Sequence, residues 1–360
     1  MTRIVVFCDG TWNSPKIVEP THVVRMSRAL INDPAQGQVV AYFAGIGTDR
    51  RFDGPVTGFL NRWGGGLFGW GLDAKVKQAY QFIARAYREG DEIYVLGFSR
   101  GAYTARSVVG MIRKCGIIAD TSTEGVNCAF ALYRKRGRTN APDEPHIKAA
   151  RAAMSPDFAT SKEDQVWRGG GIARVRVAYL GVWDTVGAKG IPVAILGPVA
   201  ALWNRRYRFH DMQLSRLVTR ARHAVALDEM RLFYQPALWD NLDDRPGQPG
   251  LNGGNVSATR PYQQVWFIGT HSIVGGSSGA RELGAFTLAW MLEGAPELTL
   301  KTGARVPQVP GDAAVSTPLL PAKKGLLRRW RKGPEHGRDV HPSVRVRIEA
   351  RSDYRPGSLR

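Results

Sequence analysis

The sequence predicts an α/β fold in which a mostly parallel sheet is flanked by helices, with helical insertions. Short runs rich in Val and Ile alternate with longer segments whose apolar residues recur at helical spacing. That order is typical of strand–helix–strand units, which build parallel sheets. The hydrophobic fraction of 43% supplies a sizeable core, and 41 glycines suit a fold with many turns.

Each expected element rests on one of these two patterns. Buried strands are expected at residues 4–8, 39–43, 93–96, 174–183 and 264–269. Helices are expected at residues 23–31, 72–88, 102–112 and 283–292. A polar stretch around residues 128–170 carries scattered prolines, and it is expected to be a helical insertion within a main domain of residues 1–300.

Two further segments follow the main domain. Residues 301–340 are basic and rich in Pro and Gly, and we expect them to be solvated. Within them, residues 323–332 mix Leu and Trp with Lys and Arg, so contact with a membrane surface is the alternative. In the tail, residues 341–360, the alternation of Val344, Val346 and Ile348 indicates partial order.

The charge balance favours anionic partners. The chain has 50 Lys and Arg residues against 31 Asp and Glu, a formal net charge of +19. A phospholipid surface, a nucleic acid or an acidic protein would each suit this charge, as would a plain solvated basic surface. The basic residues are spread along the chain without a known nucleic-acid module, so nucleic acid is the partner we least expect.

Cysteine spacing and the N-terminus bear on metals and location. The three cysteines, Cys8, Cys115 and Cys128, lack metal-type spacing and cannot all pair, so free thiols in a reducing compartment are expected. We expect neither a metal nor a cofactor. The first apolar run is too short for a signal peptide, which predicts a cytoplasmic location and leaves signal-less export open. Oligomeric state is left open.

The strongest functional signal is Gly97-Phe98-Ser99-Arg100-Gly101. This G-x-S-x-G pattern lies between an expected strand and an expected helix, where a sharp turn exposes the serine. Flanking glycines let neighbouring backbone pass closely, and the helix N-terminus places N–H groups beside the hydroxyl. Ser99 is therefore the candidate nucleophile.

Two more polar side chains follow expected strands. Asp184 comes directly after the strand at 174–183, and His271 follows the strand at 264–269. Functional groups of α/β sheets gather at the carboxyl ends of strands. A turn cap is the alternative for Asp184, and Asp228 is the reserve acid in that case.

The chain order Ser99, Asp184, His271 is that of α/β-hydrolases. In such a triad the serine attacks an acyl carbon, the histidine moves its proton, and the aspartate fixes the imidazole tautomer. The oxyanion would be met by backbone N–H groups of Arg100 and of Gly10 or Thr11. The residue types thus predict a serine esterase or lipase acting on acyl esters.

Several segments together resemble the α/β-hydrolase domain family known as domain of unknown function 2235, which includes phospholipase effectors delivered by type VI secretion. The matching segments are residues 6–13, 45–49, 97–102, 182–187, 226–229 and 266–272. The resemblance implies an α/β-hydrolase fold and a phospholipid substrate. It extends to about residue 276.

One position departs from that family. Its histidine motif usually reads His-Ser-Asp-Val-Gly-Gly, whereas this chain has Ile273 at the third position. If the missing acid orients the histidine in relatives, Asp184 must do so alone here. The alternative function is therefore a catalytically weak protein that binds an acidic partner or a membrane surface.

Overall fold

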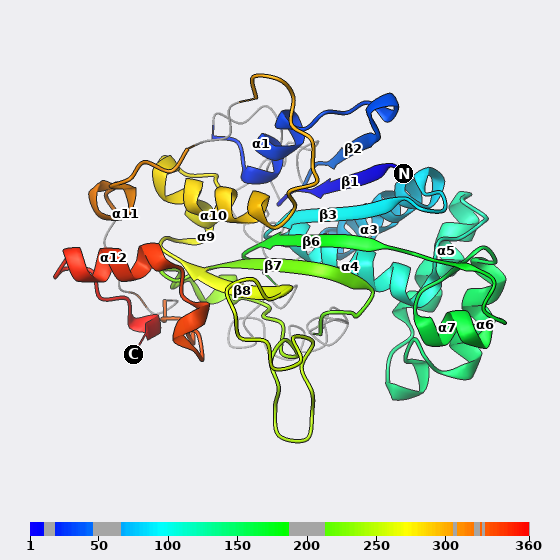
Figure 1. The fold of residues 1–360 in the computed structure, drawn as a ribbon. Coiled ribbons are helices and arrows are strands. Elements are labelled where there is room, and N and C mark those ends of the chain that lie inside the picture. Colours follow the sequence, from blue (N-terminus) through cyan, green and yellow to red (C-terminus); the bar gives the residue numbers. More distant parts are fainter. Residues whose placement is uncertain are drawn as a thin grey trace.

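The computed structural model describes residues 1–10, 19–45, 66–186, 213–304, 308–319, 325 and 328–359. Within these residues six strands form one sheet of order β2-β1-β3-β6-β7-β8, and every neighbouring pair is parallel (Figure 1). The strands are β1 (Arg3–Cys8), β2 (Gln38–Phe43), β3 (Glu92–Phe98), β6 (Val177–Trp183), β7 (Val218–Ala226) and β8 (Tyr262–Phe267). The predicted α/β class is confirmed.

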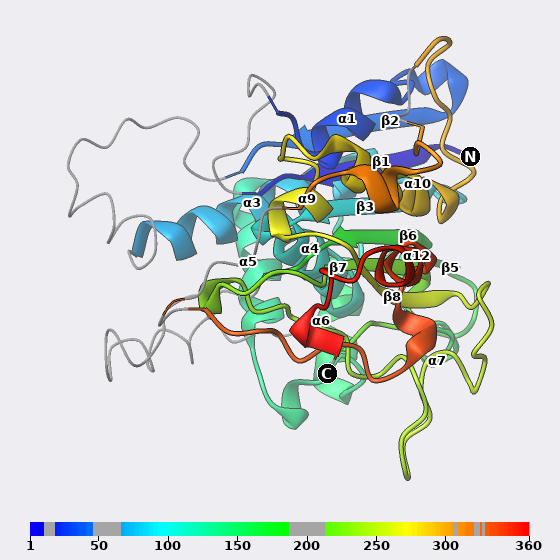
Figure 2. The same ribbon diagram turned by 90° about the vertical axis from the view of Figure 1, so that its left-hand side faces the viewer.

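Helices cover both faces of this sheet (Figures 1 and 2). Successive strand residues point to opposite faces, so β1 sends Ile4 and Val6 to one side and Val5 and Phe7 to the other. One layer contains α3 (Gly66–Ala86), α4 (Arg100–Cys115) and α5 (Thr123–Arg134), and the other contains α1 (His22–Ala29) and α10 (Arg281–Glu293). Burial on both faces explains why β1, β3 and β6 are nearly continuous apolar runs.

The strand order places a switch point between β1 and β3. From β1 the chain passes to β2 on one side, whereas β3 lies on the other side and continues to β6. Connections that leave in opposite directions open a crevice at the carboxyl ends of such strands. The turn after β3 carries Ser99, so the fold itself places the candidate nucleophile at this edge.

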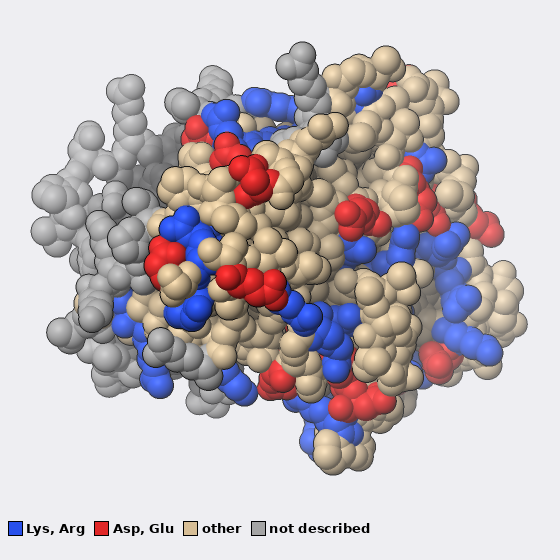
Figure 3. Space-filling model, turned by 60° about the vertical axis from the view of Figure 1, so that its left-hand side comes forward, with Lys and Arg blue, Asp and Glu red and all other residues tan. Residues whose placement is uncertain are grey.

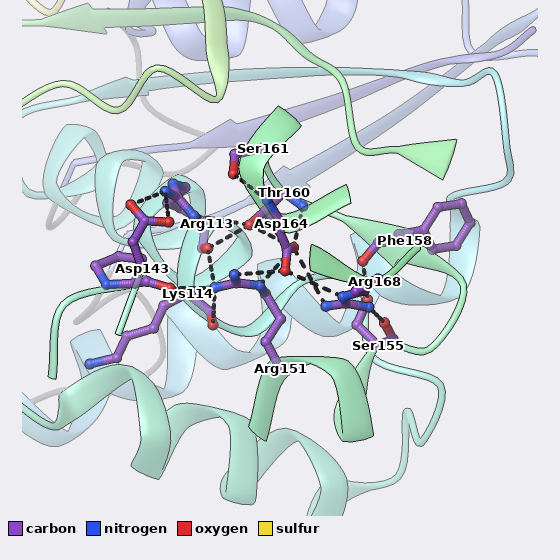
Figure 4. Close-up of polar contacts among 11 residues, drawn as sticks. Arg113, Lys114, Asp143, Arg151, Ser155, Phe158, Thr160, Ser161, Asp164 and Arg168 are labelled. Atoms are coloured by element: carbon purple, nitrogen blue, oxygen red, sulfur yellow. Dashed lines mark hydrogen bonds and ion pairs between the residues drawn. The ribbon is translucent and has the colours of Figure 1, made fainter. Parts of the chain in front are cut away.

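The predicted insertion contains the end of α5, together with α6 (Pro145–Met154), α7 (Lys162–Trp167) and the short strands β4 (Phe158–Ala159) and β5 (Ala173–Arg174). A buried ion pair holds it together (Figure 4). Arg151 meets both carboxylate oxygens of Asp164 at 2.9 Å, and both side chains are fully buried. Arg113 of α4 pairs with Asp143 at 2.7 Å, which ties the insertion to the main sheet layer.

The C-terminal part packs on the β7–β8 side of the sheet. There α11 (Ala313–Ser316) and α12 (Pro342–Ala350) join a third apolar cluster in which Val344 and Tyr354 pack with Trp266. The tail expected to be partly ordered contains a helix at residues 342–350, with Val344 buried and Val346 exposed. Among the described helices, none is long and apolar enough to cross a bilayer.

Two other elements differ from the prediction. Strand β7 was missed, because Arg220, Arg222 and His223 interrupt its apolar pattern. Helix α3 begins at Gly66, six residues before the expected start. Single 3₁₀ turns lie at Pro34–Gln36, Arg138–Asn140, Leu232–Tyr234, Gly337–Asp339 and Gly357–Leu359.

Candidate active site

Ser99 lies in a strained turn between β3 and α4. Its backbone angles are φ 58° and ψ −121°, a region that non-glycine residues rarely adopt. Ser99 occupies the position before the helix, yet its side chain makes no capping bond to α4. The hydroxyl is instead directed to His271, whose Nε2 lies 2.8 Å from Oγ.

The two flanking glycines are required by close backbone approach. A Cβ on Gly101 would lie 2.1 Å from the carbonyl oxygen of Cys8, and one on Gly97 would lie 2.5 Å from the carbonyl oxygen of Gly101. The G-x-S-x-G pattern therefore allows the end of β1 to pack directly against the turn that carries Ser99.

We expect Gly101→Ala to destabilise the protein by about 1–3 kcal/mol, because backbone must move to admit the methyl group. The same shift would displace Ser99 and lower any serine-dependent activity. Gly171→Ala is the control, since a Cβ there meets nothing within 4 Å. Thermal melting of both variants tests this, and an unchanged melting temperature for Gly101→Ala would contradict it.

Asp184 follows β6 and is fully buried, with a left-handed φ of 39°. Its Oδ1 accepts from the Ala226 N–H at 2.9 Å, and its Oδ2 lies 2.6 Å from Nδ1 of His271. Burial alone would raise the pKa of Asp184, but the charge of Arg331 and the bond from His271 hold it well below its ordinary value. The carboxylate is therefore ionised.

His271 begins the one-turn helix α9 (His271–Val274) rather than lying in an irregular loop. Its ring lies between the rings of Phe98 and Tyr234, with centroids 4.6 Å and 4.8 Å away. Burial lowers the pKa of His271, and the bond and charge of Asp184 oppose that effect. The pKa values of both His271 and Asp184 are thus lowered. Burial is the larger effect at the imidazole, whereas the charge of Arg331 lowers the pKa of the carboxylate.

The structure brings Ser99, His271 and Asp184 into one hydrogen-bonded chain and leaves Asp228 out of it. The Asp228 carboxylate accepts from the Gly269 N–H at 2.6 Å and from the Tyr354 hydroxyl at 3.0 Å. Burial raises the pKa of Asp228 to about 6, although these bonds oppose the shift. Asp228 thus supports the backbone before His271.

The departure at position 273 does not disturb the imidazole contacts. Ile273 is buried in the third apolar cluster with Trp266 and packs closely against Gly269. The acid that contacts the backbone of His271 is Glu229, whose Oε2 accepts a hydrogen bond from the His271 N–H at 3.2 Å. Glu229 also pairs with Arg231 at 2.6 Å.

Of the three expected oxyanion donors, the described residues include Arg100 and Gly10, whereas Thr11 lies outside them. Arg100 begins α4, so its backbone N–H belongs to the positive end of the helix dipole beside Ser99. The Gly10 N–H donates to Oδ1 of Asp9 at 2.7 Å, so it is engaged locally in this structure. Burial raises the pKa of Asp9 to about 6, although hydrogen bonds from Tyr42, Gly10 and Thr21 act to lower it.

Arg331 is a site residue that the sequence pattern did not indicate. It was expected to be solvated within the basic segment, and that expectation is wrong, because its side chain is fully buried against Asp184. The distance from Arg331 Nη1 to Asp184 Oδ1 is 2.6 Å. Nothing in the run of Lys and Arg around it distinguishes this residue.

Among the hollows lined by the described residues, a small cavity lies at the site and a large cleft lies away from it. A small cavity of about 10 Å³ lies beside Arg100 and Gly101 and is also lined by Asp9. A cleft of about 690 Å³ lies along the α4–α5 side, and none of its lining residues belongs to the Ser99 chain. On the face in Figure 3, Lys and Arg are interspersed with Asp and Glu rather than gathered in one patch.

Comparison with known proteins gives matches over most of the chain. A family model described as "T6SS, Phospholipase effector Tle1-like, catalytic domain" matches residues 2–294. The uncharacterized protein YEL023C of Saccharomyces cerevisiae is 28% identical over 237 residues, which cover 64% of this chain and 31% of that protein. The chain thus spans about a third of this curated relative.

Solved structures align over similar stretches. An uncharacterized protein from Pseudomonas aeruginosa matches with a TM-score of 0.43 and 17% identity, covering 85% of this chain and 48% of the other. The Tle1 effector bound to the VgrG spike of the type 6 secretion system matches with a TM-score of 0.40 and 15% identity, covering 77% and 51% respectively. The chain therefore spans about half of each solved chain.

Proposed function

The chain belongs to the family of Tle1-like phospholipase effector catalytic domains of type VI secretion, and from that premise we propose that it hydrolyses carboxylic esters of phospholipids through Ser99, His271 and Asp184. The observation that carries this proposal is the contact chain from Ser99 Oγ to His271 Nε2 at 2.8 Å and from His271 Nδ1 to Asp184 Oδ2 at 2.6 Å. No metal or cofactor enters the scheme.

The reaction has two halves. Ser99 Oγ attacks the acyl carbon while His271 Nε2 takes the hydroxyl proton, and the proton then passes to the leaving alcohol as the ester bond breaks. Water next attacks the acyl-serine, again giving its proton to His271, which returns it to Ser99 as the fatty acid leaves. Asp184 accepts from Nδ1–H throughout, and so holds the tautomer whose Nε2 can accept.

The negative oxygen formed in each half needs donors. The Arg100 N–H at the start of α4 is the first donor in our scheme, helped by the positive end of the helix dipole. A second comes from Gly10 or Thr11, and Gly10 would first have to leave Asp9. Removing one such donor typically costs about 3 kcal/mol in the barrier.

The lowered pKa of His271 sets the pH dependence. The imidazole acts as a base only when neutral, so kcat/KM should fall as pH drops through the His271 pKa, which lies below its ordinary value of 6.5. A pH profile of kcat/KM on a soluble ester tests this. An acid limb with its midpoint above pH 7 would contradict it.

The net charge of +19 leads us to propose an anionic lipid surface as the preferred site of action. The family also leads us to propose delivery by type VI secretion. Vesicles of phosphatidylglycerol and of phosphatidylcholine, matched in acyl chains, test the substrate class. We expect release of fatty acid, faster from the anionic vesicles and less so at high salt.

Failure to release fatty acid or any other product from either vesicle, by protein that is folded, would count against a phospholipid substrate. A soluble short-chain ester in the same experiment separates two outcomes. Hydrolysis of that ester alone would retain the esterase and reject the phospholipase. Hydrolysis of neither would favour the alternative in which the protein only binds its partner.

A further inference from the structure

Arg331 belongs to a C-terminal segment that lies beyond the family match, which ends at residue 294. Residues 328–331 run beside the loop that follows β7. The Arg329 N–H donates to the Met230 carbonyl at 2.7 Å, and the backbones of Arg328 and Arg231 form an isolated antiparallel β-bridge. This path carries the Arg331 side chain under the carboxylate of Asp184 from a part of the chain 147 residues away.

The guanidinium of Arg331 forms a two-pronged contact with that carboxylate. Nη1 lies 2.6 Å from Oδ1 and Nη2 lies 2.9 Å from Oδ2, while Nη1 also donates to the Ala226 carbonyl at 2.9 Å and Nη2 donates to the Tyr234 carbonyl. The Nε atom is buried without a partner. A fully buried guanidinium is tolerated only when paired, so Asp184 is what holds Arg331 in this position.

The planar guanidinium of Arg331 constrains the orientation of the Asp184 carboxylate. Oδ1 of Asp184 accepts from Ala226 and Arg331, whereas Oδ2 accepts from His271 and Arg331. With both oxygens held, rotation of the carboxyl group would break several bonds at once. The oxygen that meets Nδ1 is therefore fixed by contacts from both sides of the site.

Arg331 also acts on the imidazole by its charge. The charged groups around His271 are Asp184 after β6, Glu229 after β7, and Arg331 from the C-terminal segment, with Arg231 pairing with Glu229. The two carboxylates favour the protonated ring, and Arg331 is the group whose charge opposes it. In that role Arg331 offsets part of the attraction that Asp184 exerts on a proton at the ring.

We propose that Arg331 is a positioning residue of this site, which orients the Asp184 carboxylate toward His271 through its two-pronged contact. The inference rests on the proposed function for its effect on rate. Its structural content, the coupling of Arg331 to the Asp184–His271 pair, stands independently of turnover. The segment beyond the family match thus completes the site in this chain.

The test compares two variants. Arg331→Met removes the charge, whereas Arg331→Lys keeps the charge and loses the two-pronged contact of the guanidinium with the carboxylate. For Arg331→Met we expect kcat to fall about 10- to 100-fold through misplacement of the base. We also expect the acid limb of kcat/KM to rise by about one pH unit, since a nearby cation has been removed. Arg331→Lys should keep the acid limb of the wild type while kcat falls.

Arg347→Met is the matched control. Arg347 is also buried in the C-terminal part, where it donates to the Ala314 carbonyl at 2.7 Å and lies over the ring of Tyr354. Among the described residues Arg347 forms no hydrogen bond or ion pair with Asp184, so its loss should lower the melting temperature without moving the acid limb. A shift of the acid limb in this control equal to that in Arg331→Met would overturn the proposal.

NMR separates this proposal from the proposed function. Titration of the His271 ring, assigned against His271→Gln, reports its pKa without any substrate, and the Nδ1–H resonance reports the bond to Asp184. We expect a raised ring pKa in Arg331→Met and an altered Nδ1–H resonance in both Arg331 variants. If Arg331→Met does not fold, Arg331→Lys decides, and wild-type NMR signals in a folded variant would overturn the proposal.

Discussion

Replacing Ser99 with alanine should abolish ester hydrolysis, with a loss of kcat on the order of 10⁶-fold. The Oγ that lies 2.8 Å from His271 Nε2 is the only atom in our scheme that forms the acyl intermediate. The remaining rate would come from binding and oxyanion contacts alone. Initial rates of fatty-acid release, with KM measured separately, test this prediction.

Ser107→Ala provides the control for that experiment. Ser107 is another buried serine of α4, two turns beyond the strained position. We expect it to retain a rate within a few-fold of the wild type. A Ser99→Ala protein that is folded and hydrolyses the ester at the wild-type rate would remove Ser99 from the mechanism.

The Asp184→Asn variant should lose about 10⁴-fold in kcat, because an amide can stabilise the wrong imidazole tautomer. The same change leaves the buried Arg331 charge without its partner, which we expect to destabilise the fold by about 3–5 kcal/mol. Measurement of kcat below the lowered melting temperature separates the catalytic loss from unfolding.

The stabilisation contributed by Asp184 depends on pH in a defined direction. Its pKa is depressed in the folded protein, so its contribution is complete above the unfolded value of about 4 and is lost as pH falls below that. Asp184→Asn should remove this dependence. Urea unfolding at pH 7 and at about pH 2 checks it, and an equal dependence in both proteins would contradict the ion pair.

Asp164→Asn breaks a comparable pair elsewhere in the molecule. Asp164 and Arg151 form a fully buried ion pair in the insertion (Figure 4). This pair shares no residue with the Ser99 chain. This variant should lose a similar amount of stability and keep its kcat. If both variants lost kcat equally, the loss in Asp184→Asn would reflect general destabilisation and not the tautomer.

The sequence predicts the site residues best where a polar side chain follows an apolar run that forms a buried strand. Ser99 and Asp184 directly follow β3 and β6, His271 follows β8 after a short turn, and parallel strands bring their carboxyl ends to one edge. Chain order then predicts their roles by comparison with α/β-hydrolases. What the sequence does not predict is the distance between them, which depends on the packing of β3, β6 and the turn after β8.

The parts that could not be predicted depend on tertiary context. Strand β7 has three basic or titratable residues, and each finds a partner in the fold: the buried His223, for example, bonds Gln264 at 2.9 Å. Arg331 looks like its neighbours in a basic run and differs only by facing Asp184. The apolar residues of helix α12 are spaced in a way that suits either a helix or a strand. Its packing on β8 therefore decides which of the two it forms.

The most direct measurement of the central claim is labelling of the folded protein with a fluorophosphonate, followed by peptide mapping. We predict one covalent label, on Ser99, absent from Ser99→Ala and strongly reduced in His271→Gln, because the serine reacts only when the imidazole at 2.8 Å takes its proton. No label, or a label on another serine in protein that hydrolyses the ester, would contradict the account.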